Sequence, residues 1–151
     1  MNITLSSIKY SSFASHETAC FSAVVLVDGF KAGTVENSGQ GGSNDYHPHT
    51  LRDALDAHGA TLPAYIFDAS HADGTIPVDA DIFVNSLLDD FLAARDLKRG
   101  LSKRMMQIRD GAVYQTRTMP AATLAALVAK TPDALNNLPF SDALALYRAA
   151  A

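Results

Sequence analysis

The segment from Phe21 to Asn37 constrains the fold more than any other part of this chain. Residues Phe21 to Val27 are rich in β-branched and aromatic side chains, which favour a half-buried strand. Asp28-Gly29 follows, and this dipeptide is typical of a tight two-residue turn because both central positions need positive φ. Phe30 to Asn37 then supplies a second, more polar arm. The sequence therefore predicts a β-hairpin at the centre of the fold.

Shorter elements are predicted on both sides of this hairpin. Ile3 to Tyr10 has the alternation of a first strand. Leu51 to Gly59 is predicted to form a short helix with Thr50 as N-cap and Gly59 as the C′ residue. Leu62 to Phe67 reads as a short strand or an irregular buried segment, since Pro63 weakens the strand pattern. Ser70 to Pro77 is rich in turn residues and is predicted to be an exposed loop.

The clearest helical pattern lies between Asp79 and Gly100. Acidic residues at its start and basic residues at its end suit the helix dipole, and Gly100 is expected to stop it. We expect its apolar face to cover the sheet that carries Phe21, Val25 and Val27, with Phe83, Leu87 and Phe91 buried there. Apolar residues recur with helical spacing at Ala80, Phe83, Val84, Leu87, Leu88 and Phe91.

The last third of the chain predicts a second hairpin and two more helices. Arg104 to Arg109 and Ala112 to Thr118 flank Asp110-Gly111, and a helix is expected after Met119-Pro120. A final helix is expected after Ser141 as N-cap, with Leu144 and Tyr147 facing inward. The predicted fold is a single α+β domain spanning 1–151. It has a mainly antiparallel sheet, built from two Asp-Gly hairpins plus an N-terminal strand, covered by one long and several short helices.

Composition excludes several classes of protein. The 151 residues have a formal net charge of −4, which disfavours sequence-independent binding to nucleic acid through overall charge. The single cysteine, Cys20, precludes an internal disulfide and is typical of a reducing compartment. No apolar run approaches the roughly 18 residues that a membrane span needs, and the N-terminus lacks the apolar core of a signal peptide. We therefore expect a cytoplasmic protein.

Several motifs of the chain resemble one group of proteins. The pattern Phe21-x-Ala23-x-Val25-x-Val27-Asp28-Gly29, then Gly33-x-Val35-x-Asn37-x-Gly39-Gln40-Gly41-Gly42 and Tyr46, is similar to small proteins encoded by phages and other mobile elements. The second hairpin and the segment from Leu135 to Leu144 share this likeness. The group carries no established activity. The resemblance implies a setting, the cytoplasm of a host cell. Small proteins of this kind often act by binding a host protein. One expected role is therefore inhibition of a host defence complex, as an anti-CRISPR does.

The glycine-rich loop after the first hairpin is one candidate site. Successive backbone N–H groups in such loops can bind an anion or a nucleotide, although no Walker A or G-x-G-x-x-G sequence is present. The alternative is that Gly41 and Gly42 shape the chain where a strand turns into a helix, with positive φ at one or both. The candidate ligand residues are Gly39, Gln40, Gly41, Gly42, Asn44, His47 and His49.

The histidines around Pro48 raise the question of a metal site. His47 and His49, with Asp45 nearby and His71 and Asp73 in a later loop, have the right ligand types. Their spacing does not place two imidazoles on one face, as a helical i, i+4 pair would. A hydrogen-bonding role is favoured, and no metal or cofactor is predicted.

Charge is unevenly distributed along the chain. Half of the twelve Lys and Arg residues lie within fifteen positions, from Arg95 to Arg109. This cluster is either a solvated helix end and edge strand or a docking patch for a macromolecule. The residues proposed to bind a partner are Lys98, Arg99, Lys103 and Arg104. An opposing acidic set could instead meet a basic partner: Asp79, Asp81, Asp89 and Asp90.

Two functional hypotheses follow. The first is a non-enzymatic binding protein that engages a host protein or ribonucleoprotein complex, with direct nucleic-acid binding less favoured. The second is an enzyme or small-ligand binder that uses the Gly39–His49 loop. The sequence has no recognisable nucleophile–base pair, no paired catalytic carboxylates and no cofactor fingerprint, so the first hypothesis leads.

Overall fold

The predicted hairpin forms the centre of a four-stranded antiparallel sheet. In the computed structural model, which describes residues 1–151, β2 (Cys20–Val27) pairs with β3 (Phe30–Ser38) across a turn with φ of 50° at Asp28 and 86° at Gly29. Positive φ at both positions confirms the predicted turn. The predicted N-terminal strand, β1 (Ile3–Ser11), pairs with β2, and β4 (Asp45–His47), which was not predicted, pairs with β3.

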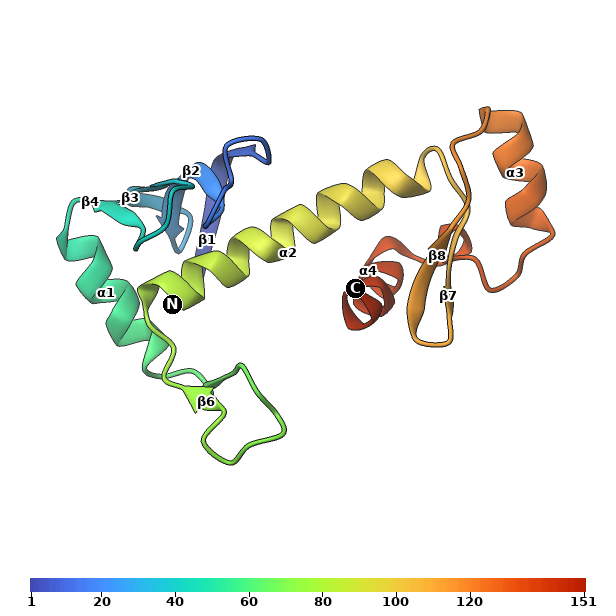
Figure 1. Ribbon diagram of the computed structural model, residues 1–151. Coiled ribbons are helices and arrows are strands. Elements are labelled where there is room, and N and C mark those ends of the chain that lie inside the picture. The colour runs from blue at the N-terminus through green and yellow to red at the C-terminus, as the bar shows by residue number, and fades with distance from the viewer. The chain divides into compact units, whose positions relative to one another are not determined.

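The chain divides into two units that are described separately below. Unit 1 comprises Met1–Leu88 and unit 2 comprises Asp89–Ala151, and the helix α2 (Ala80–Leu101) runs from the first into the second. The α+β class predicted from the sequence is confirmed, because helices accompany antiparallel sheets along the chain (Figure 1). None of these helices has the length and the apolar composition that crossing a membrane would require.

One face of the sheet in unit 1 is buried. Phe21, Ala23 and Val25 alternate along β2, and Val35 lies opposite Ala23 on β3, so these side chains share a face. Helix α1 (Thr50–Gly59) approaches the sheet closely, since a Cβ on Gly33 would lie 2.8 Å from Cδ2 of Leu51 in the first turn of that helix. The other buried apolar residues of unit 1 are Ile3, Tyr46, Leu51, Leu55, Ala80, Val84 and Leu88.

The ends of α1 differ from the predicted caps. The N-cap is His49 rather than Thr50, because the amides of Leu51 and Arg52 already donate to the carbonyls of Pro48 and His49. Gly59 lies inside the last turn and has no left-handed conformation. Its role is close packing instead, since a Cβ there would lie 2.4 Å from the carbonyl oxygen of Val78.

Helix α2 begins as predicted but buries a different strip of side chains. Asp79 caps it by accepting a hydrogen bond of 2.8 Å from the amide of Ile82. Its buried residues are Ala80, Val84 and Leu88, together with Leu97 in unit 2. These three residues of unit 1 belong to the predicted apolar face, which is confirmed to that extent. The three residues expected to be buried against the sheet are wrong as a core strip, because Phe83 and Leu87 are only half-buried and Phe91 is 38% exposed. Both strips have a spacing of four, so the periodicity could not distinguish them.

A small hairpin connects α1 to α2. It consists of β5 (Tyr65–Ile66) paired with β6 (Thr75–Ile76). The short-strand alternative for 62–67 is thus confirmed in part. The alternative of an irregular buried segment is wrong, because both residues of β5 are exposed. The region predicted as a loop, Ser70 to Pro77, contains the second of these strands.

Unit 2 is built around the second hairpin. β7 (Met106–Arg109) pairs with β8 (Ala112–Gln115) across Asp110 and Gly111, whose φ values are 50° and 75°. The turn was predicted correctly, but this hairpin forms a sheet of its own instead of extending the first. Figure 1 shows it between the helices α3 (Ala121–Ala129) and α4 (Phe140–Ala150).

Two apolar clusters hold unit 2 together. The first contains Leu97, Met106, Leu135 and Ala143, and the predicted inward residues Leu144 and Tyr147 pack against it. The second contains Met105, Leu124 and Ala134. A short 3-10 helix, η1 (Leu135–Asn137), connects α3 to α4. Two helix ends differ from their predicted positions. Pro139 rather than Ser141 is the N-cap of α4, and α2 continues one residue beyond Gly100.

Candidate functional site

The glycine-rich loop takes part in many hydrogen bonds within unit 1. Gly39, Gly41 and Gly42 have φ values of 83°, 92° and 87°, which confirms the expected positive φ at the last two. The amide of Gly39 donates to Oδ1 of Asn37 at 2.9 Å, and that of Gly41 donates to Oγ1 of Thr18 at 3.3 Å. These two amides are therefore engaged by the protein itself rather than directed at a ligand.

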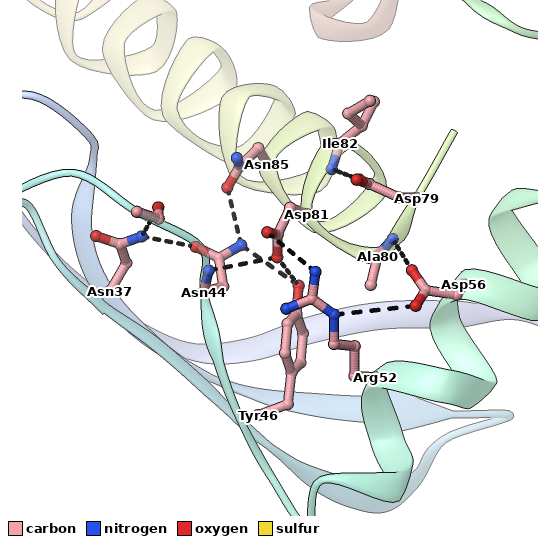
Figure 2. Close-up of polar contacts among 11 residues, drawn as sticks. Asn37, Asn44, Tyr46, Arg52, Asp56, Asp79, Ala80, Asp81, Ile82 and Asn85 are labelled. Carbon is pink, nitrogen blue, oxygen red and sulfur yellow. Dashed lines mark hydrogen bonds and ion pairs between the residues drawn. The ribbon is translucent and has the colours of Figure 1, made fainter. Parts of the chain in front are cut away.

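A network of buried polar side chains continues from this loop to the start of α2 (Figure 2). The amide group of Asn37 donates to Oδ1 of Asn44 at 3.0 Å, and the amide group of Asn44 donates to Oδ1 of Asn85 at 3.3 Å. The hydroxyl of Tyr46 donates to Oδ1 of Asp81 at 2.7 Å. All buried side-chain nitrogen and oxygen atoms of the protein have partners, so this network connects loop, sheet and helix without an unsatisfied group.

The electrostatics of this network keep Tyr46 protonated. Burial of the phenol raises the pKa of Tyr46 far above its ordinary value, and the hydrogen bond to Asp81 acts in the same direction, whereas Asn44 and Arg52 oppose it. The guanidinium of Arg52 lies 3.7 Å from Oδ2 of Asp81 and balances that carboxylate. Tyr46 is thus a hydrogen-bond donor in a structural network. Sequence reasoning noticed Tyr46 in a motif but not this role.

The histidines considered as metal ligands do not come together in one cluster. The rings of His47 and His49 have centroids 5.9 Å apart. His71 instead contacts Oδ2 of Asp68 at 2.7 Å in the loop between β5 and β6. No cluster of three or more metal-ligating side chains exists in the protein.

A groove of about 480 Å³ lies on the sheet of unit 1. None of the candidate residues of the glycine-rich loop lines it. Its walls come from β1, β2 and β3, with Asp45 from β4, and include Lys9, Tyr10, Cys20, Phe21, Glu36 and Asn37.

The predicted partner-binding residues gather around a second cavity, in unit 2. This basic hollow has a volume of about 450 Å³, and three of the four predicted residues, Arg99, Lys103 and Arg104, line it. Lys98 is exposed but is not part of the lining. The remaining lining residues are Asp96, Gly100, Met106, Gln115, Thr118 and Tyr147.

The three cations of the basic hollow have no acidic partner. None of them takes part in an ion pair within 4.0 Å. Asp96, the one acidic residue in the lining, is paired with Arg95 at 3.1 Å. Arg109, which belongs to the same cluster in the sequence, lies 3.8 Å above the ring of Tyr114. Tertiary structure thus selects three members of the predicted cluster and leaves their charge uncompensated.

The backbone that carries these cations is firmly held. The amides of Lys103 and Arg104 both donate to the carbonyl of Gly100, at 3.0 and 2.8 Å. The side chain of Asn136 accepts a hydrogen bond from the amide of Met106 and donates to the carbonyls of Leu101 and Arg104. A basic turn fixed in this way needs little reorganisation to bind an anionic group.

The two units carry opposite net charge. Unit 1 contains three Lys and Arg residues and ten Asp and Glu residues, a formal charge of −7. Unit 2 contains nine and six of these types, a formal charge of +3. The net positive charge of the protein is therefore confined to unit 2.

Comparison with known proteins found no protein family, no curated protein and no solved structure that matches this chain.

Proposed function

We propose that this protein is a non-enzymatic binding protein that docks an acidic surface of another macromolecule in its basic hollow. The observation that supports this function is the set of three unpaired cations, Arg99, Lys103 and Arg104, around one cavity. Arg104 donates to the hydroxyl of Thr118 at 3.4 Å, but none of the three cations is neutralised by an internal carboxylate. They are therefore available to form charge-assisted hydrogen bonds with the carboxylates of a partner. Their fixed backbone lowers the ordering cost of that contact.

An acidic protein surface suits this hollow better than a nucleic acid does. The cations surround a compact cavity instead of forming a continuous stripe along a backbone track. Tyr147 is the one aromatic residue of the lining and is half-buried against the apolar cluster of unit 2, so the hollow lacks the series of exposed rings on which successive bases stack. The net charge of −4 also opposes long-range attraction of a polyanion.

A cytoplasmic setting is part of this proposal. The single cysteine has no disulfide partner, which supports a reducing compartment, and the resemblance to phage and mobile-element proteins supports the cytoplasm of a host cell. We also propose a narrower role, inhibition of a host defence complex. It is supported by the resemblance of the hairpin and glycine-loop motifs to phage and mobile-element proteins.

The test compares two matched double variants. Arg99→Glu/Lys103→Glu reverses two exposed cations of the hollow, and Arg117→Glu/Lys130→Glu makes the same charge change at exposed positions of unit 2 outside it. Each protein is immobilised and exposed to nuclease-treated bacterial lysate, and captured proteins are quantified by mass spectrometry. We expect the hollow variant to lose a stoichiometric partner by about tenfold or more, which is 1.4 kcal/mol, and the control variant to retain it.

Two further measurements complete the test. Thermal melts of both variants establish that the fold is intact. Affinity for the captured partner is then measured at rising salt, and it should fall for the wild type because exposed charges are screened. Equal capture by wild type and hollow variant contradicts the proposal. Capture from untreated lysate that is absent from nuclease-treated lysate identifies a nucleic acid as the ligand and also contradicts the proposal.

A further inference from the structure

Exposed apolar side chains are concentrated around the β5–β6 hairpin of unit 1. We call this group the hairpin patch: Leu62, Tyr65, Ile66, Phe67 and Ile76. All five side chains are exposed, with Ile66 at 61% and Phe67 at 59%. Single exposed apolar residues are normal on protein surfaces, whereas five within fifteen consecutive residues are the kind of concentration that marks an interaction site.

The patch borders an apolar groove. This groove has a volume of about 440 Å³, and Leu62, Tyr65 and Ile66 form one wall. The start of α2 forms the other wall through Ile82 and Phe83, with Val78 and Pro63 completing it. Phe83 is held in place by an edge-on contact with the ring of His58, whose centroid lies 5.0 Å away. The groove can therefore receive an apolar side chain between two ordered walls.

The hairpin that presents the patch is organised by its own contacts. The amides of Phe67 and Asp68 both donate to the carbonyl of Gly74, at 2.9 and 3.1 Å. Gly74 is required there, because a Cβ would lie 1.7 Å from the carbonyl oxygen of Asp68. The carboxylate of Asp68 accepts hydrogen bonds from Ser70, which with His71 lower the pKa of Asp68. The apolar side chains thus project from a defined turn.

The surroundings of the patch are acidic. No Lys or Arg occurs between Arg52 and Arg95, and Arg52 is already engaged with Asp56 and Asp81. Asp73 lies in the hairpin loop, and Asp79 bonds to the amide of Ile82, a residue that lines the groove. A partner that fills the groove would therefore meet the Asp79 carboxylate beside the wall formed by α2.

We propose that the hairpin patch docks a protein segment that presents an apolar anchor flanked by Lys or Arg. The apolar anchor matches the groove, and the flanking cations match the acidic edge. A second copy of this chain is a poorer occupant through the same surface, because like charges would face each other. This inference goes beyond the proposed function, since it concerns unit 1 and a partner surface of opposite charge. The protein would then have two docking surfaces of different chemistry.

The probe for this site is a short fluorescent peptide of helical period with Leu and Phe on one face and Lys and Arg on the other. Two matched peptides replace either Lys and Arg by Glu, or Leu and Phe by Ser. Binding to the full-length protein is followed by fluorescence anisotropy. We expect only the first peptide to bind well, with affinity about tenfold or more above that of the other two.

Matched protein variants locate the binding. Ile66→Ser/Phe67→Ser removes two apolar side chains of the patch, and Phe13→Ser/Phe30→Ser removes two exposed phenylalanines elsewhere in unit 1, which are 91% and 79% exposed. Asp73→Asn/Asp79→Asn neutralises the acidic edge while keeping a side chain that can cap α2, and Asp45→Asn/Asp53→Asn is its control. The patch and edge variants should weaken binding, and both controls should leave it within about twofold.

Three outcomes would overturn the inference. One is equal binding of the first peptide to wild type and to Ile66→Ser/Phe67→Ser. Another is equal binding of the basic and acidic peptides, which would show that the edge charges play no part. The third is a dimer of the free protein in sedimentation that disappears in the patch variant, which would identify a second copy as the occupant. Because the basic hollow lies in unit 2, its charge-reversal variant should bind the first peptide like the wild type, so the two proposals fail independently.

Discussion

The hydroxyl of Tyr46 donates a 2.7 Å hydrogen bond to the carboxylate of Asp81, 35 residues later in the chain. Tyr46 lies on β4, the strand that leaves the glycine-rich loop, and Asp81 lies in the first turn of α2. The amide of Asn44 also donates to Oδ1 of Asp81, at 3.3 Å. This carboxylate therefore joins the end of the sheet to the start of the long helix.

Removal of the Tyr46 hydroxyl should destabilise unit 1. We expect Tyr46→Phe to lower the free energy of unfolding by about 1–3 kcal/mol, because a buried hydrogen bond to a charged group is lost. The matched control is Tyr65→Phe, whose side chain is exposed. Urea denaturation of both variants measures the difference. Equal stability of the two would show that the contact with Asp81 contributes nothing.

The same residue predicts a dependence of stability on alkaline pH. Burial of the phenol is the main cause that raises the pKa of Tyr46 above its ordinary value of 10.0. The unfolded chain therefore loses this proton at a lower pH than the folded chain does. The stability contribution is complete below about pH 10 and declines as the pH rises further. Unfolding measured from pH 8 to pH 11 should show a steeper decline for wild type than for Tyr46→Phe.

Gly39 should tolerate a side chain less well than its neighbour Gly42. Both have positive φ, but a Cβ on Gly39 would lie 2.2 Å from the carbonyl oxygen of Ala14, whereas a Cβ on Gly42 would meet no atom within 4 Å. We expect Gly39→Ala to cost roughly 3 kcal/mol and Gly42→Ala about 1 kcal/mol, the latter from backbone strain alone. Thermal melts of both variants measure the difference. Equal destabilisation by Gly39→Ala and Gly42→Ala would indicate that the loop is loosely packed around Gly39.

The core strip of α2 can be tested by comparing Leu88 with Phe91. Leu88 is fully buried and Phe91 is 38% exposed. Leu88→Ala should lower the free energy of unfolding by about 2–5 kcal/mol, because it leaves a cavity. Phe91→Ala should cost about 1 kcal/mol or less, since its ring already meets water. Denaturant titrations measure both variants. If Phe91→Ala lowers the free energy of unfolding more than Leu88→Ala does, the buried strip of α2 is the one expected from the sequence.

Asn136 should be the most important polar residue for the basic hollow. Its side chain makes three hydrogen bonds to the backbone between Leu101 and Met106, with lengths of 2.9 to 3.1 Å. We expect Asn136→Ala to cost about 2–3 kcal/mol, because it leaves partly buried backbone groups without partners. Asn137→Ala is the control, since that side chain is exposed and makes two such bonds. A loss at Asn137 equal to that at Asn136 would contradict the special role of this side chain.

Local features of the sequence were sufficient to predict both hairpins. The dipeptides Asp28-Gly29 and Asp110-Gly111 adopt positive φ at low cost, so they determine both turns locally. The register of β2 with β3 is not set by the turn alone, because it shifts between Val25 and Leu26. The start of α2 was also predictable from local sequence, because the Asp79 side chain accepts a hydrogen bond from the amide of Ile82, only three residues later. The clustering of cations near the end of α2 was equally visible, because charge is a property of composition.

Only tertiary structure decided how these local elements combine. Two strips of α2 have identical spacing, and contacts with distant segments select Val84 and Leu88 over Phe83 and Leu87. β4 and β6 are too short to have a periodic signal and exist because they pair with β3 and β5. The three cations line a cavity because residues later in the chain, Gln115, Thr118 and Tyr147, form the rest of its lining. Contacts between residues far apart in sequence depend on the packing of whole elements, and a local pattern does not encode them.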